Sequence, residues 1–89
     1  PAVDLAIVAA IASSFLDKPV PDRTVVMGEV GLTGEVRAIG QADTRIYESA
    51  KMGFNRCIVP QSNLKRLPAM EGVAIAGVST VSEAVESLF

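Results

Sequence analysis

An almost uninterrupted apolar run opens the chain. Residues 3–16 are nearly all Ala, Ile, Leu, Val and Phe. They predict a helix that is apolar around most of its circumference and therefore buried on more than one side. Pro1 and Asp4 suit its start, because proline lacks the amide hydrogen that would be unpaired there and a carboxylate favours the positive end of the helix dipole. Pro19 and Pro21 end it, since proline cannot continue the hydrogen-bond ladder.

β-Branched and alternating residues follow, around a glycine-rich centre. Residues 24–30 (TVVMGEV) predict a strand, and residues 35–39 (EVRAI) alternate polar and apolar side chains, as in a half-exposed antiparallel strand. The turn between them, residues 31–34 (GLTG), has glycine at both ends. This pattern predicts a β-hairpin. It lacks the glycine spacings of dinucleotide-binding and Walker-type loops, so the glycines do not predict a phosphate site.

The rest of the chain alternates helical and extended patterns. A helix is expected at residues 41–52, with Ala42, Ile46 and Ala50 facing inward and Gly53 at its end. The other elements are expected as buried strands at 56–59 and 73–78, a loop or single helical turn at 61–67, and a last helix that begins at a Ser79 or Thr80 cap and runs through Leu88. This order predicts one α/β (α+β) sandwich, a mixed sheet packed by helices, across residues 1–89.

Composition narrows the class of protein. The chain has 89 residues, of which 49% are hydrophobic and 20% charged, so it predicts one small packed domain, or part of one, and not a disordered segment. We expect a fragment of a longer protein, because the sequence begins Pro-Ala-Val without a methionine. No apolar run reaches the roughly 18 residues that a membrane helix needs, and no signal peptide is expected. One cysteine, Cys57, predicts a reducing cytoplasm, and with no histidine no zinc-type ligand cluster is expected.

Charge is unevenly distributed along the chain. The formal net charge is −2, which gives no general argument for nucleic-acid binding. Residues 41–66 nevertheless hold five basic and two acidic side chains, a local net charge of +3. A locally basic face is therefore possible, and its alternative is ordinary solvated surface with Glu48 and Lys51 as a helical pair. The basic residues of this segment are Arg45, Lys51, Arg56, Lys65 and Arg66.

Few residues suit nucleophilic catalysis. A Ser-His-Asp triad is impossible without histidine. Ser14 and Lys18 are four residues apart, but Lys18 precedes a helix-breaking proline and is expected to point to water, while the mid-helix serines, 13 and 14, are expected to bond back to helix carbonyls. Cys57 is expected to be a buried, inert thiol. Asp4 and Asp43 form either a carboxylate pair or, as the spacing favours, a capping and a surface aspartate.

Motifs along the whole chain resemble the proteolytic domain of Lon-type ATP-dependent proteases. They are residues 27–30 (MGEV), 33–36 (TGEV), 50–53 (AKMG) and 58–60 (IVP), with Asn63. More closely, residues 28–37 (GEVGLTGEVR) and 56–60 (RCIVP) resemble the C-terminal Lon-like domain of the bacterial RadA (Sms) family of DNA repair proteins. The Mg-chelatase-like ComM family shares the Lon-like fold, but its hairpin and following helix differ. The resemblance implies a Lon proteolytic-domain-like fold, of which residues 1–89 form the C-terminal part.

The two catalytic positions of the Lon family are filled differently in this sequence. Lon proteases carry their serine nucleophile in a Gly-Pro-Ser-Ala-Gly motif, and here Ala2 stands at the serine position. Their lysine base lies in an Ile-Gly-Gly-Leu-Lys motif, which residues 39–43 match with Asp43 at the lysine position. Alanine has no hydroxyl, and a carboxylate cannot replace the neutral lysine that takes the serine proton. The resemblance thus implies that this domain is not an enzyme by itself.

The resemblance to the RadA family also implies a role for the whole protein. It implies ATP-dependent DNA repair and branch migration of recombination intermediates, with this domain as hexamer assembly platform and DNA-contacting surface. The implied partners are further copies in a hexameric ring, single-stranded or branched DNA and RecA recombinase, with no membrane. ATP, Mg and a zinc site are implied upstream, and the cytoplasm as the location. The five basic residues of 41–66 are the DNA-binding candidates.

Two other functions remain open at this point. One is a Lon-type serine peptidase, active through an unrecognised Ser-Lys pair or inactivated. The other is a ComM-like helicase accessory domain. Four apolar side chains are expected either at a subunit interface or in the core: Phe15, Leu16, Phe54 and Phe89.

Overall fold

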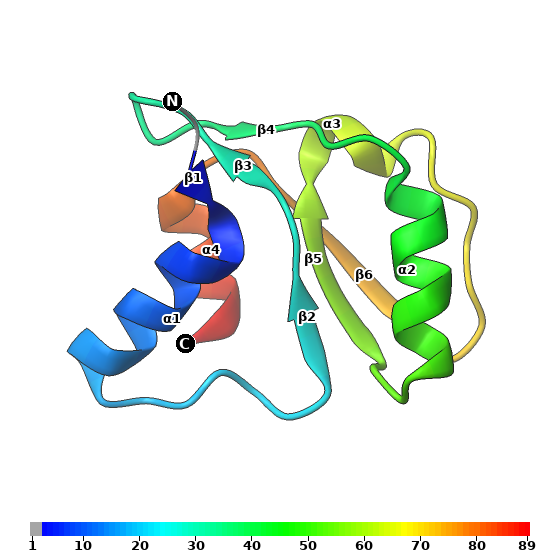
Figure 1. Ribbon diagram of the computed structural model, residues 1–89, viewed down its shortest axis with the longest axis horizontal. Helices are drawn as coiled ribbons and strands as arrows, with labels where there is room; N and C mark the ends of the chain where they lie inside the picture. The colour runs from blue at the N-terminus through cyan, green and yellow to red at the C-terminus, as the bar shows by residue number, and fades with distance from the viewer. Residues whose placement is uncertain (1–2) are drawn as a thin grey trace.

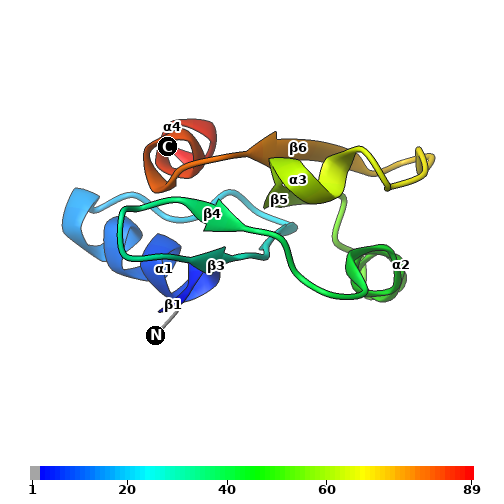
Figure 2. The ribbon, with the colours of Figure 1, turned by 90° about the horizontal axis from the view of Figure 1, so that it is seen from above.

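Two small sheets and four helices make up residues 3–89, the part of the chain that the computed structural model describes. Helices α1 and α4 lie together on one side of the molecule and α2 lies on the other, with β2, β5 and β6 between them (Figures 1 and 2). In chain order the elements are β1 (Val3–Asp4), α1 (Leu5–Leu16), β2 (Thr24–Val26), β3 (Glu29–Val30), β4 (Val36–Arg37), α2 (Ala42–Lys51), β5 (Arg56–Pro60), α3 (Gln61–Leu64), β6 (Ala74–Val78) and α4 (Val81–Leu88).

The strands pair in two different ways. The first sheet has the order β1-β3-β4 and is antiparallel, with Val30 opposite Val36. The second has the order β2-β5-β6 and is parallel, with Cys57 of the central strand opposite Val25 and Ile75. The predicted α/β class and the predicted hairpin are therefore confirmed, but the parallel and antiparallel pairs occupy separate sheets instead of one mixed sheet.

The predicted strand 24–30 is wrong as one element, because it is divided at residues 27–28. The Met27 amide still donates to the Ile58 carbonyl of β5, at 2.9 Å. Gly28 then has φ +149°, a conformation that favours glycine, and its carbonyl accepts from the Leu5 amide at 2.9 Å. The chain leaves the parallel sheet at this point and enters the antiparallel one.

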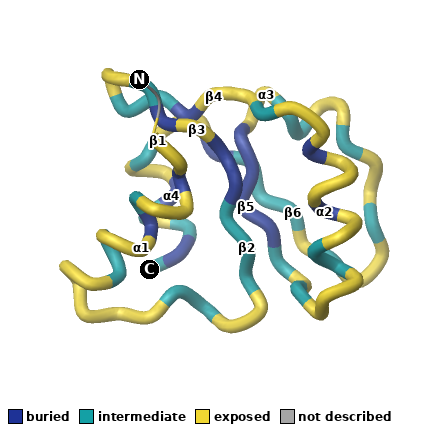
Figure 3. Tube along the Cα trace, in the orientation of Figure 1, coloured by how far each residue is buried: buried dark blue, intermediate teal, exposed yellow. Residues whose placement is uncertain are grey.

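Strand β5 separates two apolar clusters, because successive side chains of a strand point to opposite faces. Ile58 packs with residues of α1 and α4, among them Leu5 and Leu88. Its neighbours Cys57 and Val59 face α2. All three strand residues have no exposed surface, and Figure 3 shows β5 as the buried centre of the molecule. A strand covered on both faces explains the continuous apolar run that the sequence shows here.

Helix α1 begins two residues later than predicted. Asp4 is its cap, and the carboxylate accepts from the Ala6 amide at 2.7 Å. Leu5 is the first helical residue, and Asp17 ends the helix in the left-handed conformation. Pro1, predicted as part of the helix start, lies outside the described residues. The capping role of Asp4 confirms that this aspartate acts locally at the helix terminus.

The expectation that α1 is buried on more than one side is wrong for this chain. Leu5 and Ala9 are the buried residues of the helix. Ile7, Ile11 and Phe15, spaced four apart, are 56%, 64% and 88% exposed. These three residues, called the α1 stripe below, form an apolar surface with no cover among residues 3–89.

No described helix has both the length and the apolar character that crossing a membrane requires.

The other helix ends follow the local signals in the sequence. Gly53 has φ +97° and follows Met52, the residue that caps α2, as a glycine at a helix end should. Thr80, and not Ser79, caps α4: its hydroxyl oxygen accepts from the Glu83 amide at 3.1 Å. The Glu83 carboxylate accepts from the Ser79 amide at 2.6 Å. This reciprocal arrangement satisfies two amides that would otherwise be unpaired.

Candidate nucleic-acid interface

The candidate site lies where the segment after the hairpin meets α2 and α3. Asn63 of α3 fixes this segment to the rest of the fold. Its side-chain amide accepts from the Ile39 backbone amide and donates to the Ile39 carbonyl, both at 2.9 Å. Both bonds are partly buried. Asn63 therefore determines where the chain turns into α2.

Gln41 makes that turn with an unusual backbone. It precedes α2 with φ +56° and ψ +39°, the left-handed region, and makes no capping bond with its side chain. The corresponding position of the Lon motif is glycine, which adopts this conformation without steric cost. The turn places Asp43 in the first turn of α2, where its carboxylate oxygen accepts from the Thr44 amide at 2.9 Å. A carboxylate near a helix N-terminus is electrostatically favourable.

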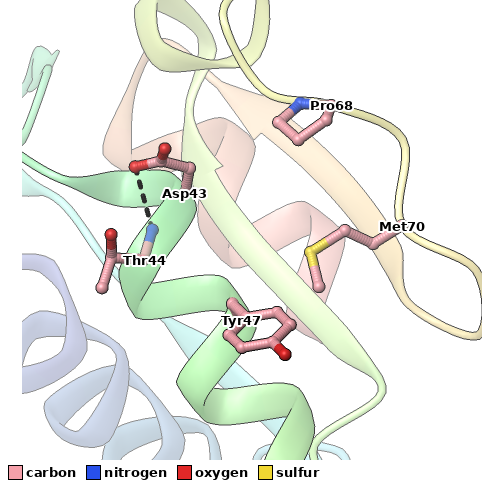
Figure 4. A pocket seen from close by; sticks show the side chains of 5 residues that line it. All are labelled: Asp43, Thr44, Tyr47, Pro68 and Met70. Carbon is pink, nitrogen blue, oxygen red and sulfur yellow. Dashed lines mark hydrogen bonds between the residues drawn. The ribbon is translucent and has the colours of Figure 1, made fainter.

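Two hollows meet at Asp43. One, of about 340 Å³, includes Gln41, Asp43, Asn63 and Arg66 in its lining. The other, of about 320 Å³, lies between α2 and the segment that leads to β6. Its lining residues are Asp43, Thr44, Tyr47, Pro68 and Met70 (Figure 4). Because they share Asp43, we treat them as one depression, called the α2 groove below.

Basic side chains stand at both ends of the α2 groove. The Lys51 ammonium lies 4.6 Å from the centre of the Tyr47 ring, and both side chains are on the exposed part of α2. Lys65 and Arg66 follow α3 and are exposed, and Arg66 lines the groove beside Asp43. Arg45 is exposed as well. At about 100° per residue it lies roughly 160° around the helix from Tyr47, on the far side of α2 from the groove.

Arg56 points elsewhere. Its guanidinium donates to the Ser87 carbonyl at 2.6 Å and to the Ser87 hydroxyl at 3.4 Å, near the end of α4. The side chain is half-buried and shares a face of β5 with Ile58, opposite the face that α2 covers. A cation at a helix C-terminus is stabilising. The structure thus brings two of the five predicted cations to the groove: Arg66 lines it and Lys51 lies over Tyr47 at its edge. Lys65 is exposed next to Arg66 in the sequence.

The structure describes one of the two Lon catalytic positions and not the other. Asp43 is exposed at the lysine position, as described above, while Ala2 lies outside the described residues. Among residues 3–89, no hydrogen bond joins a serine or threonine hydroxyl to a lysine amine. The Ser13 hydroxyl donates to the Lys18 carbonyl, beyond the end of α1, which corrects the expectation of a bond to a helix carbonyl.

Cys57 and the acidic residues are the remaining side chains that could be reactive or bind a metal. Cys57 is fully buried, which confirms the predicted burial, and burial raises the pKa of its thiol. Its inertness stays a prediction. Within residues 3–89 no group of three His, Cys, Asp or Glu side chains is placed to hold a metal ion.

Two residues of the site have no distinct signal in the sequence. For Tyr47, its position i, i+4 to Lys51 is the available hint of a shared helix face. The sequence shows Asn63 as part of a family motif but does not indicate what its side chain binds. Its pairing with Ile39 spans 24 residues of sequence, and no local pattern reports such a contact.

Comparison with known proteins identifies the family. The family model described as "Subunit ChlI of Mg-chelatase" matches residues 1–63. The chain is 47% identical over 87 residues to DNA repair protein RadA of Bacillus subtilis, which covers 98% of this chain and 19% of that protein. For RadA of Halalkalibacterium halodurans the identity is 46% over 86 residues, covering 97% of this chain and 19% of the relative. For RadA of Streptococcus pneumoniae it is 40% over 89 residues, covering 100% and 21%.

The chain thus spans about a fifth of the length of these curated relatives. The similarity extends over the hairpin, α2 and β5, which carry the family motifs, and continues to the last helix. It confirms the resemblance to RadA that the motifs predict. The chain therefore belongs to the ChlI family, as a domain whose sequence is similar over nearly its whole length to part of DNA repair protein RadA.

Proposed function

We propose that this chain is a non-proteolytic Lon-like domain of a RadA-type DNA repair and recombination protein, in which it contacts DNA and supports ring assembly. The similarity to proteins named for DNA repair, over 97–100% of the chain, is the observation that carries this proposal. The exposed Asp43 at the Lon lysine position supports it, because a carboxylate cannot act as the neutral amine base of a Ser-Lys dyad.

A Lon-type peptidase that uses another Ser-Lys pair is the second candidate. Such a pair requires a hydroxyl within hydrogen-bond reach of an amine. The hydroxyls of Ser13 and Ser49 donate instead to backbone carbonyls, and that of Ser87 accepts from Arg56. These contacts favour the non-proteolytic function.

The DNA contact is proposed for Lys51, Lys65 and Arg66. All three are exposed, so phosphates can approach them. Arg66 lines the α2 groove, Lys51 lies over Tyr47 at its edge, and Lys65 directly precedes Arg66 in the chain. Lysine and arginine attract the DNA backbone without regard to base sequence. Arg56 contributes less, because its guanidinium is held by α4. Arg45 would meet DNA on the opposite side of α2.

The assembly role is proposed for the α1 stripe. Ile7, Ile11 and Phe15 expose a contiguous apolar face, and such faces mark surfaces that other protein covers. Within the whole protein that cover belongs to the assembled ring, which we propose is a hexamer.

Activities that depend on the rest of the protein are proposed by family membership alone. They are branch migration driven by ATP with Mg, a separate zinc site, cooperation with RecA recombinase, and a cytoplasmic location. The residues described here bind none of these cofactors in our proposal. This domain contributes DNA contact and assembly to them.

A salt series tests the DNA contact. The whole protein is compared with a variant in which Lys51, Lys65 and Arg66 are changed to Gln, using single-stranded DNA. Each lost phosphate contact lowers the slope of log K against log salt by about 0.7 on a single strand, so the expected decrease is about 1 to 2. A control variant removes the same charge from three exposed residues elsewhere: Lys18, Arg23 and Arg37. Equal slopes for all three proteins contradict the proposal.

A further inference from the structure

The α2 groove has a second half whose chemistry differs from that of a phosphate site. Tyr47, Pro68 and Met70 make it largely apolar, and Asp43 and Thr44 add one polar end (Figure 4). The Tyr47 side chain is 55% exposed and stands beside this hollow of about 320 Å³. A volume of this size is at the lower end of those that bind small molecules. An aromatic ring next to a carboxylate in an open hollow suits a flat ligand that carries hydrogen-bond donors at its edge.

We propose that this hollow binds one unpaired base of a single DNA strand, stacked on Tyr47, with the amino group of the base donating a hydrogen bond to the Asp43 carboxylate. The inference rests on the proposed function, because it requires a DNA strand at the α2 groove. It adds a base-binding position and a preference for cytosine over thymine to what would otherwise be a contact with phosphates alone.

Stacking is the first contribution. Every base has a flat π-face, and stacking on an aromatic side chain is a main source of affinity in single-strand binding. The apolar side chains of Pro68 and Met70 lie on the other side of the hollow from α2, so a base placed there is covered by apolar groups. Tyr47 is the single tyrosine of the chain, and the chain has no tryptophan. Among the residues that line this hollow, Tyr47 supplies the aromatic ring on which a base can stack.

Charge at the two ends of the groove is the second contribution. Lys51 lies 4.6 Å from the Tyr47 ring centre, and Arg66 lines the adjoining hollow that shares Asp43. At 1.5 Å per residue, Asp43 and Lys51 are about 12 Å apart along α2. A strand that follows the helix therefore places phosphates near Lys51 and Arg66 while one base enters between them. Lys51 and Arg66, with the exposed Lys65 next to Arg66 in the sequence, outnumber Asp43 and Glu48, which favours a polyanion over a cationic peptide.

Asp43 supplies the selectivity. A carboxylate repels phosphates, so its position between cations is unfavourable for a purely electrostatic site. It is suited to accept hydrogen bonds from a base, and the amino group of cytosine is such a donor. Thymine presents a carbonyl oxygen at the same position, which a carboxylate repels. The expected order is therefore cytosine above thymine.

The test measures binding of the whole protein to oligo(dC) and oligo(dT) of equal length at slightly alkaline pH. Tyr47→Leu is expected to weaken binding of both strands about 5- to 150-fold, the range of a lost stacking contact. Tyr47→Phe keeps the ring and should bind within about twofold of the wild type. Asp43→Asn should bring the ratio of the dC and dT affinities close to one.

The matched control for the charge change is Glu48→Gln. Glu48 is also exposed on α2, five residues from Asp43. Both variants remove one negative charge, and both should strengthen phosphate contacts. Glu48→Gln should therefore raise the two affinities together and leave their ratio unchanged.

The outcomes separate this inference from the proposed function. If Tyr47→Leu binds both strands like the wild type while the Lys51, Lys65 and Arg66 variant is weakened, the base site is wrong and the DNA contact stands. If neither variant is weakened, both proposals fail. Two other results also overturn the base site. One is that the wild type prefers duplex DNA to single strands, and the other is that the wild type, but not Asp43→Asn, binds a cationic peptide.

Discussion

Replacing Asn63 should release the segment that leads into α2. Asn63→Ala removes two hydrogen bonds of 2.9 Å, one to the Ile39 amide and one to the Ile39 carbonyl. Each such bond contributes about 0.5–1.5 kcal/mol net, so the local cost is about 1–3 kcal/mol. Because about 1.4 kcal/mol corresponds to a factor of ten, opening of this segment should become roughly 5- to 150-fold more frequent.

Hydrogen–deuterium exchange of the Ile39 amide measures this opening directly, in the whole protein. Asn63→Asp should have a smaller effect on that amide, because one carboxylate oxygen still accepts from it while the other faces the Ile39 carbonyl without a proton to donate. Ser62→Ala changes the exposed neighbour in α3 and should leave exchange unaltered. If the Ile39 amide exchanges in Asn63→Ala as it does in the wild type, Asn63 does not hold the segment.

Three further predictions concern the turn, the buried thiol and the start of α2. The pKa of Glu35 is lowered to about 2, and the largest cause is the hydrogen bond from the Thr33 hydroxyl. The turn should therefore keep its stability above pH 4.5, the ordinary pKa value, and lose it as the pH falls toward 2. Thr33→Ala should move the Glu35 pKa back toward 4.5 in an NMR titration. Cys57 should react with thiol reagents only as fast as the fold opens, and mild denaturant should accelerate the reaction; rapid reaction in the native state would show that it is not buried. Gln41→Gly relieves a left-handed backbone and should stabilise the start of α2 by up to about 1 kcal/mol, whereas Gln41→Ala should not. Exchange of the Arg45 amide, which donates to the carbonyl of residue 41 at 3.1 Å, measures this change.

Local signals were enough to predict most elements. Gly53 after α2, Thr80 before α4 and the glycine turn of the hairpin are examples. Each of these signals acts through neighbouring backbone groups, so the local structure follows from a few residues. The Lon-like motifs combine the same positions, which explains why the family was recognisable.

The division between the two sheets was not predictable in this way. Residues 24–30 are expected as one strand because four of the seven are β-branched, although Met27, Gly28 and Glu29 stand between them. The break depends on tertiary packing around Gly28, where an added Cβ would lie 3.1 Å from Val36 and 3.3 Å from Leu5. Burial of α1 was overestimated for a related reason: periodicity shows that a helix has apolar sides, but not which of them this chain itself covers.

The site was predicted less completely than the fold. The basic segment was visible in the sequence, yet a charge count cannot tell that Arg56 turns to α4 or that Arg45 lies across the helix from Tyr47. The α2 groove itself depends on residues 68–70 returning beside α2. That proximity is a property of the folded chain and not of any local pattern.

Crosslinking of the whole protein to single-stranded DNA tests the central claim most directly. Photochemical crosslinks, mapped by mass spectrometry, report which side chains lie next to the strand. We predict crosslinks on the peptides that contain Tyr47, Lys51, Lys65 and Arg66, and their reduction when the three basic residues are changed to Gln. Crosslinks confined to other surfaces, with none on residues 43–70, would contradict the account.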